Sequence, residues 1–311
     1  MNSQITDTLL MIRPTNFGFN EEAFLSNSFQ NKPLKEEEEF IQSLALDEFN
    51  TYVDQLKKLN VNVLVFDDLP KSISPDSIFP NNWISLHENG SLYQHSMLVE
   101  NRRKERRADI VAFFEAEYGF HSIDLSNSEQ GVNPAFLEGT GSMIFDHQAK
   151  KVYAAISPRT DAKLVTEFAY KLGYESIQFE AYGGKGEAIY HTNVMLCIGE
   201  DYAVVGLDTI KDSQRESVKN SLINDGKEII ELSETVEWTN DRHEFYPTTD
   251  NLLSALGMKE IYTRVINEYL RPIAIHFYQL EGYAWDVLND ESFIIRYKPE
   301  EQAHAICNSW T

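Results

Sequence analysis

The feature that most restricts the fold of this chain is a helix followed by a short strand, which recurs along the first two thirds of the sequence. Apolar residues at helical spacing precede a short apolar run at each copy. The expected helices are 36–59, 106–118, 161–172 and 213–224, and the strands that follow them are 61–66, 121–124, 176–179 and 228–232. Pairs of short strands fill the gaps, at 142–145 with 151–156 and at 194–198 with 203–207. Because one such unit cannot bury its own apolar face, the repetition predicts a ring of ββαβ units around a shared centre.

The pattern changes after residue 233. Three of the four tryptophans lie in this last part, and a polar, turn-prone stretch at 239–247 interrupts the rhythm. One helix at 259–277 and one strand at 292–297 are expected there. The sequence therefore predicts an α/β domain over 1–233 and a partial α/β segment of different origin over 234–311.

Charge and cysteine content limit the partners of the chain. A formal net charge of -22 argues against nucleic acid or an anionic membrane, so a small molecule is the expected partner. No stretch reaches the roughly 20 apolar residues that a membrane span needs, and the first ten residues lack a basic start, so we expect a cytoplasmic protein. Only Cys197 and Cys307 occur, which excludes a disulfide framework and a multi-cysteine metal site.

Three short stretches place polar side chains at the expected edges between strands and loops: Phe79-Pro-Asn-Asn-Trp83, Leu137-Glu-Gly-Thr-Gly-Ser-Met143 and Tyr190-His-Thr-Asn-Val-Met195. Hydrolysis at a guanidino or ureido carbon needs a thiolate, a proton shuttle, and carboxylates or amides that hold the planar nitrogens. His191 can titrate near neutral pH, and Glu138 leaves a buried strand beside glycines that let a ligand approach. Each residue alone is also compatible with a structural role.

These stretches resemble the pentein superfamily when they are taken together with three others, Met11-Ile-Arg-Pro14, Asn101-Arg-Arg-Lys-Glu-Arg-Arg107 and Ser157-Pro-Arg-Thr-Asp161. The most similar branch is the bacterial citrulline-utilisation hydrolases, which are similar to arginine deiminases and amidinotransferases. The resemblance implies a propeller of five ββαβ modules with the site at its centre. It also implies that Glu138 and His191 are the acid/base pair, and that no metal or organic cofactor is needed.

The resemblance further implies that Asn82 and Asn193 stand where guanidinium-binding relatives carry aspartates. A neutral ureido group offers both N–H donors and a C=O acceptor, which an amide matches without burying an unpaired charge. The asparagines therefore favour citrulline, which would be converted to ornithine, over arginine. The carboxylate of an amino-acid substrate needs a bidentate partner, and the candidates are Arg13, Arg102, Arg103 and Arg159. His95 lies in Tyr93-Gln-His-Ser-Met97, where relatives tend to show a Tyr-Pro-Met-like run, and we expect this unmatched histidine to be structural.

The nucleophile is the part that the sequence does not supply in recognisable form. Penteins of this branch end in a Gly-Gly-Gly-Ser-x-Arg-Cys-Met-like motif, which does not occur after Leu232. Cys307 lies near the end of the sequence, where the nucleophile would stand, but Ala305-Ile-Cys-Asn-Ser309 has neither the glycines nor the arginine. Cys197 is expected to be buried on a strand. We therefore expect an incomplete propeller and an impaired hydrolase.

The last segment resembles the region before the iron site of procollagen-lysine hydroxylases, through Arg242-His-Glu-Phe-Tyr-Pro-Thr-Thr-Asp250, Val265-Ile-Asn-Glu-Tyr-Leu-Arg-Pro272 and Phe293-Ile-Ile-Arg-Tyr-Lys-Pro-Glu-Glu-Gln302. His304 does not match the iron ligands of that family, so we do not expect dioxygenase activity. The alternatives to a hydrolase are a non-catalytic binding or interaction protein and a chimeric gene product. An unclosed propeller would expose strand edges, which makes a homo-oligomer an open possibility.

Overall fold

Three complete copies of one ββαβ module follow a shorter unit in the computed structural model, which describes residues 4–26, 38–68, 75–184 and 186–231 together with two short strands farther along. The first module contains β1 (Thr8–Arg13), α2 (Glu38–Lys58) and β2 (Asn62–Asp67). The second contains β3 (Ile84–Leu86), β4 (Ser91–Gln94), α3 (Ala108–Tyr118) and β5 (His121–Asp124). The third contains β6 (Ile144–Asp146), β7 (Lys151–Ala155), α5 (Ala162–Leu172) and β8 (Glu175–Phe179). The fourth contains β9 (Leu196–Ile198), β10 (Tyr202–Val205), α6 (Asp212–Asn224) and β11 (Glu228–Glu231).

Each complete module has the same strand order. Its second strand lies in the middle, antiparallel to the first strand and parallel to the third. In the third module, Val152 is therefore opposite Phe145 on one side and Ser176 on the other. The helix between the second and third strands makes the parallel return possible, as a crossover must. The first module has two parallel strands, β1 and β2.

The ends of α5 show why the helices were predictable. Asp161 accepts hydrogen bonds from the backbone N–H groups of Lys163 and Leu164, and Gly173 takes a left-handed conformation just after the last turn. Val165 and Phe168 on its inner face are buried in the core of the third module. The expected helix at 161–172 is confirmed with a start one residue later, and the other three expected helices are confirmed within two residues at each end.

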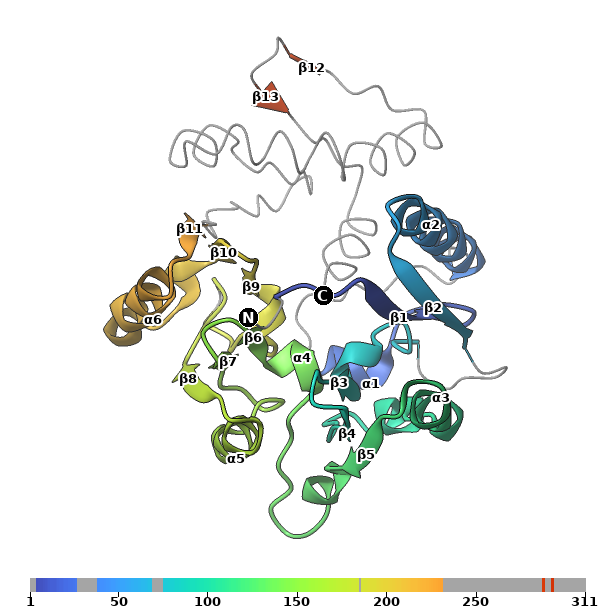
Figure 1. The fold of residues 1–311 in the computed structure, drawn as a ribbon, viewed down its shortest axis with the longest axis horizontal. Helices are drawn as coiled ribbons and strands as arrows, with labels where there is room; N and C mark the ends of the chain where they lie inside the picture. Colours follow the sequence, from blue (N-terminus) through green and yellow to red (C-terminus); the bar gives the residue numbers. More distant parts are fainter. Residues whose placement is uncertain are drawn as a thin grey trace.

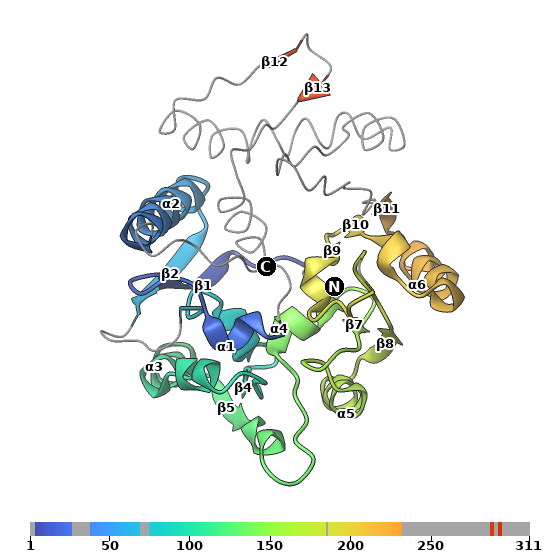
Figure 2. The ribbon, with the colours of Figure 1, turned by 180° about the vertical axis from the view of Figure 1, so that it is seen from behind.

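The modules are arranged as an arc around a short central helix, α4 (Gly139–Ser142). Helices α2, α3, α5 and α6 lie along the outside of the arc, and the sheets lie inside it (Figure 1). The view from behind shows the same order, with α4 again between the sheets (Figure 2). The residues that the structure describes do not close this arc into a ring.

Three one-turn helices lie at the centre, and each directly precedes the first strand of a complete module. They are η2 (Pro80–Asn82), α4 and η5 (Thr192–Val194). For this reason the expected strands at 142–145 and 194–198 are present as β6 and β9, but each begins two residues later than expected. Glu138 and His191 accordingly stand before a short helical turn instead of at the edge of a strand.

Glycines permit the central helices to approach one another. A Cβ atom on Gly139 would lie 2.1 Å from the backbone oxygen of Asn81, and the φ angle of Gly139 is +47°. A Cβ atom on Gly141 would lie 2.3 Å from Nδ2 of Asn82 and 2.9 Å from Nδ1 of His191. No other residue type fits these positions without displacing backbone or site side chains.

Partly and fully buried polar contacts join the third and fourth modules. Gln4 donates to the carbonyl oxygens of Phe145 and Ile198, at 2.8 and 3.1 Å, and accepts from the N–H of His147. Lys227 is buried, with Nζ 3.3 Å from Oδ2 of the fully buried Asp146. These contacts place β6 beside β9 and fix the spacing of the turns that precede them.

Several predictions fall on residues outside the described ranges. They include Cys307, the helix at 259–277 and most of the segment 234–311. Within the expected strand 292–297, Ser292–Phe293 is β13 and pairs with β12 (Val287–Leu288). Among the described residues, no helix combines the length and apolar character needed to cross a bilayer.

Candidate active site

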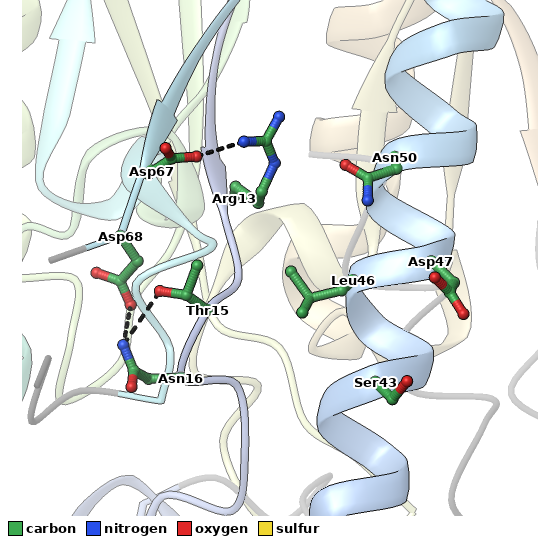
Figure 3. Close-up of a pocket in the computed structure, with 9 residues that line it drawn as sticks. All are labelled: Arg13, Thr15, Asn16, Ser43, Leu46, Asp47, Asn50, Asp67 and Asp68. Carbon is green, nitrogen blue, oxygen red and sulfur yellow. Dashed lines mark hydrogen bonds and ion pairs between the residues drawn. The ribbon is translucent and has the colours of Figure 1, made fainter. Parts of the chain in front are cut away.

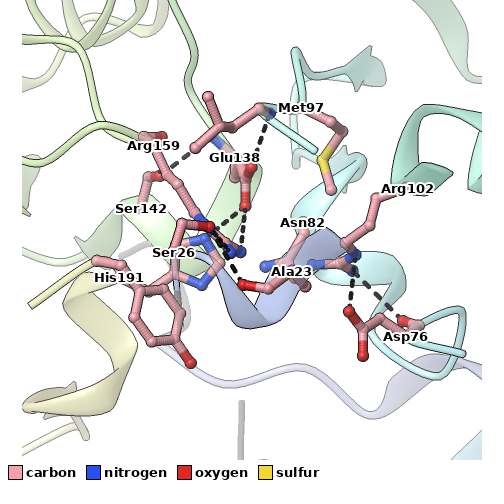
Figure 4. A network of polar contacts seen from close by, with 12 residues as sticks. Ala23, Ser26, Asp76, Asn82, Met97, Arg102, Glu138, Ser142, Arg159 and His191 are labelled. Atoms are coloured by element: carbon pink, nitrogen blue, oxygen red, sulfur yellow. Dashed lines mark hydrogen bonds and ion pairs between the residues drawn. The ribbon is translucent and has the colours of Figure 1, made fainter. Parts of the chain in front are cut away.

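Two side chains from different modules meet at the centre. Glu138 immediately precedes α4 and is fully buried, and His191 immediately precedes η5 and is 5% exposed. Nε2 of His191 lies 2.7 Å from Oε2 of Glu138, as Figure 4 shows. The other carboxylate oxygen, Oε1, accepts a hydrogen bond from the N–H of Leu98 at 2.9 Å. The pair predicted from two motifs is thus a buried, directly bonded dyad.

The surroundings of this dyad set its protonation. Burial would raise the pKa of Glu138, but the positive charge of Arg159, the hydrogen bond from His191 and the charge of Arg102 outweigh it and lower that pKa to about 2. Burial lowers the pKa of His191 below its ordinary value, although Glu138 acts in the opposite direction. At neutral pH the dyad is therefore a carboxylate bonded to a neutral imidazole.

Arg159 forms one wall of the site. Its Nη1 lies 3.5 Å from Oε2 of Glu138, its Nη2 donates to Oγ of Ser26 at 2.7 Å, and its guanidinium lies over the ring of Tyr190. Ser26 follows α1 (Glu21–Phe24), so the N-terminal segment reaches across to the dyad. Burial raises the pKa of Tyr190 to about 12, against the opposing charge of Arg159.

Asn82 forms the facing wall together with Arg102. Nη1 of Arg102 donates to Oδ1 of Asn82 at 2.8 Å, and both side chains are buried. Glu105 receives two hydrogen bonds from Arg102, each 2.9 Å long. Asp76 adds a carboxylate 3.7 Å from Nε of Arg102. Gly141 lies between Asn82 and His191, so the amide and the imidazole converge on one small region.

The structure does not bring all the predicted substrate-binding residues to this centre. Arg13 pairs with Asp67 in a separate cavity of about 810 Å³ between the ends of β1 and β2 and the helix α2 (Figure 3). That cavity does not include the dyad. Arg103 donates to the carbonyl oxygens of Met97 and Leu98, so it supports the loop that binds Glu138. Asn193 lies on η5, two residues after His191, and is half-buried.

Two further residues were assessed from sequence. Cys197 is on β9 as expected, but the prediction that it is buried was wrong, because it points to the exposed side of that strand. It is the one cysteine among the described residues. His95 is fully buried and its Nε2 lies 2.7 Å from Oγ of Ser85, in agreement with a structural role.

Sequence reasoning missed Asp76, Glu105 and Ser26. Glu105 lies three residues after Arg102, and Asp76 lies three residues before the motif that begins at Phe79, which are signals that could have been used. Ser26 carried no such signal, because it reaches the site from a segment 133 residues before Arg159.

The chain is similar in fold to several solved structures. The N-terminal domain of ArgZ, an arginine dihydrolase from cyanobacteria, matches with a TM-score of 0.57 and 16% identity over 72% of this chain and 75% of that one. Unliganded AgrE matches with a TM-score of 0.58 and 15% identity over 73% of this chain and 30% of that one. A dimethylarginine dimethylaminohydrolase structure also matches, with a TM-score of 0.49, 16% identity, and coverage of 80% and 89%. No curated protein sequence matches the chain.

These likenesses show that the chain shares the fold of ArgZ and AgrE. Together with the family model described below, they support the predicted pentein superfamily. The resemblance of the last segment to procollagen-lysine hydroxylases stays a prediction. A family model described as eukaryotic N,N-dimethylarginine dimethylhydrolase matches residues 13–240, which is most of the sequence. The chain therefore belongs to the eukaryotic N,N-dimethylarginine dimethylhydrolase family.

Proposed function

We propose that this chain binds an arginine-like amino acid and has a hydrolase site directed at its guanidino or ureido carbon, with citrulline as the preferred ligand. The observation that carries the proposal is the buried dyad of Glu138 and His191. The family name refers to dimethylarginine, and one structural relative is described as an arginine dihydrolase. Both descriptions agree with a ligand that carries a planar carbon bonded to nitrogen.

The dyad defines a path for protons. A carboxylate has no proton to donate, so the hydrogen between Nε2 of His191 and Oε2 of Glu138 belongs to the imidazole. Nδ1 of His191 is then the unprotonated nitrogen, and it faces the region above Gly141. As a nucleophile forms its bond to the planar carbon, Nδ1 takes the proton. The imidazolium, stabilised by Glu138, then gives that proton to the nitrogen whose bond to carbon breaks.

Arg159 is the arginine best placed to bind the carboxylate of the amino acid. It is 2% exposed and contacts the dyad, and its buried Nε has no hydrogen-bond partner among the described residues. Arg103 remains a second candidate. Asn82 and Asn193, as neutral amides, favour a neutral ureido group over a cationic guanidinium.

The nucleophile decides whether binding leads to turnover. Cys197, the cysteine that the structure describes, lies on an exposed side of β9, whereas His191 is buried. Cys307 falls outside the described residues and lacks the motif of the related enzymes. We therefore propose that turnover is impaired and that ligand binding is retained, which makes a binding protein the second candidate function.

The test combines calorimetric titration with an assay of ornithine release. Wild-type protein should bind L-citrulline, and His191→Ala should bind it more weakly. If the wild type releases ornithine rapidly and His191→Ala abolishes this release, the proposal of impaired turnover is wrong and the chain is an active hydrolase. Failure of citrulline, L-arginine and dimethyl-L-arginine to bind the wild-type chain would refute the proposed function altogether. Sequencing the transcript across residues 225–245 tests the chimeric alternative.

A further inference from the structure

Each of the three side-chain nitrogens of Arg102 has a partner within the protein. Nε and Nη2 donate to the two carboxylate oxygens of Glu105, and Nη1 donates to Oδ1 of Asn82. Nη2 also points to the backbone oxygens of Asp76 and Phe79. The side chain is 3% exposed, and a bidentate pair with a buried carboxylate fixes its plane. Arg102 is therefore held in place before any ligand arrives. It has no pair of parallel N–H donors left to bind a substrate carboxylate.

This arrangement removes the usual ambiguity in the orientation of an asparagine amide. Oxygen and nitrogen of an amide are exchangeable in many structures, and only their partners decide between them. Arginine has five donors and no acceptor, so the atom that faces Arg102 must be the amide oxygen. The Nδ2 group of Asn82 then points the other way, to within 2.3 Å of the position that a Cβ of Gly141 would occupy. His191 borders the same position.

We propose that Arg102 is a positioning residue that restricts Asn82 to donating hydrogen bonds at the site, and that the group it reads is the ureido oxygen of citrulline. The inference rests on the proposed function, and it names the residues that make the site select citrulline over arginine. A free asparagine could meet either a C=O or an N–H of the ligand. Because Arg102 occupies the amide oxygen, Asn82 can only donate a hydrogen bond to an acceptor on the ligand.

The same geometry works against a guanidinium. All the nitrogens of a protonated guanidinium carry hydrogens and none accepts a hydrogen bond. Placed against Nδ2 of Asn82, such a group would leave a buried donor on each side without a partner, which typically weakens binding by about 10-fold to 100-fold. Selection of citrulline over arginine then arises from the direction of one amide, which Arg102 and Glu105 set.

Asn82→Asp tests the inference because it keeps the size of the side chain and the bond to Arg102. One carboxylate oxygen would still accept from Arg102, and the other would now present an acceptor to the site. The expected result is a change of about 10-fold to 100-fold in the ratio of the dissociation constants for L-citrulline and L-arginine, in favour of arginine. Isothermal titration measures this ratio without any need for turnover. Asn81→Asp, one residue earlier, is the matched control for the added charge and should keep the wild-type ratio.

A second variant tests Arg102 itself. Lysine is a point charge without a fork and cannot bind Glu105 twice and Asn82 as well. Arg102→Lys should therefore release the amide and bring the two dissociation constants to within about threefold of each other, since either face of the amide could then meet the ligand. Circular dichroism confirms that each variant is folded.

The outcomes separate the two proposals. If the wild type binds citrulline but Asn82→Asp keeps the wild-type ratio, the positioning role of Arg102 is wrong and the proposed function stands. An equal shift in Asn81→Asp would also overturn the inference, because charge alone would explain it. If the wild type binds neither amino acid, the proposed function fails and the inference fails with it.

Discussion

Nε2 of His191 lies 2.7 Å from Oε2 of Glu138, although the two residues are 53 positions apart in the sequence and belong to different modules. The carboxylate keeps the hydrogen on Nε2 and leaves Nδ1 free to take a proton. Glu138→Gln would keep the shape of the side chain and remove the charge that stabilises the imidazolium. We expect any ornithine release to fall by about 100-fold or more, because general acid–base catalysis typically contributes 10²-fold to 10⁴-fold.

The control for that variant is Glu129→Gln. Glu129 is another poorly exposed carboxylate with arginine partners, Arg106 and Arg103, and it lies outside the dyad. The Glu129→Gln variant should be less stable than the wild type, but the molecules that remain folded should keep most of their activity. Equal losses of activity in the two variants, measured per folded molecule, would show that Glu138 has no special role.

The two central glycines should respond differently to substitution. Gly139→Ala would place a Cβ 2.1 Å from a backbone oxygen in a left-handed conformation, and we expect destabilisation of about 2 kcal/mol or more in urea unfolding. Gly141→Ala would instead press on Asn82 and His191, so ligand binding should weaken more than the fold. Gly18→Ala, where a Cβ meets nothing within 4 Å, is the control. Wild-type stability of Gly139→Ala would contradict the tight packing of the central helices.

The buried pair of Lys227 and Asp146 should contribute strongly to the joint between the third and fourth modules. Lys227→Met leaves the carboxylate of Asp146 buried without a counter-charge, and such changes typically cost about 3–5 kcal/mol. Adding Asp146→Asn removes the unpaired charge and should recover part of the loss. Urea unfolding of the two single variants and the double variant gives the coupling energy. Strictly additive losses would show that the two side chains do not interact.

Acid should weaken the fold through a histidine cluster in the second module. Ser85 bonds to both His87 and His95, at 2.9 and 2.7 Å. Burial, with help from a neighbouring histidine charge in each case, lowers the pKa of His87 to about 4 and that of His95 to about 3. Both groups are neutral at pH 7 in the folded and unfolded chains. Below about pH 6.5 the unfolded chain takes up protons that the folded chain excludes, so stability falls as the pH falls.

The expected loss is about 2 kcal/mol for each of these histidines at pH 5 relative to pH 7. His95→Gln, whose amide can still donate to Ser85, should reduce the loss of stability between pH 7 and pH 5 by about 2 kcal/mol. The remaining dependence includes His87 and also His147 and His191, whose pKa values burial lowers as well. His121→Gln changes an exposed histidine and should leave the dependence as it is. Urea unfolding at several pH values between 5 and 7 measures all three proteins. An unchanged slope in His95→Gln would contradict the assignment to this cluster.

The order of helices and strands could be predicted from the sequence because their patterns are local. The expected helix at 106–118 became α3, and the strand at 121–124 became β5 without change. The centre could not be predicted in this way. Its one-turn helices approach one another because Gly139 and Gly141 of α4 fit against residues of other modules. No local pattern distinguishes these helices from the start of a strand.

The candidate site could likewise be predicted only as far as local motifs reveal it. Motifs identified Glu138 and His191, but only the folded chain shows that they are bonded. Cys197 was misplaced because an apolar run suggests burial, whereas adjacent side chains on a short strand point to opposite faces. Arg13 was grouped with the site as a candidate partner for the carboxylate of the substrate, yet it lies at the end of β1 beside α2.

The placement of η2, α4 and η5 before three different modules has a practical consequence for dividing the protein. The exposed loop at 130–134 separates Asn82 from Glu138 and His191 in the sequence. If the chain is cut at that loop, we expect each of the two fragments to fold around its own sheets. Neither fragment would contain both walls of the site. Recovery of citrulline binding after mixing such fragments would then report their association, which makes this fold a natural basis for a split sensor.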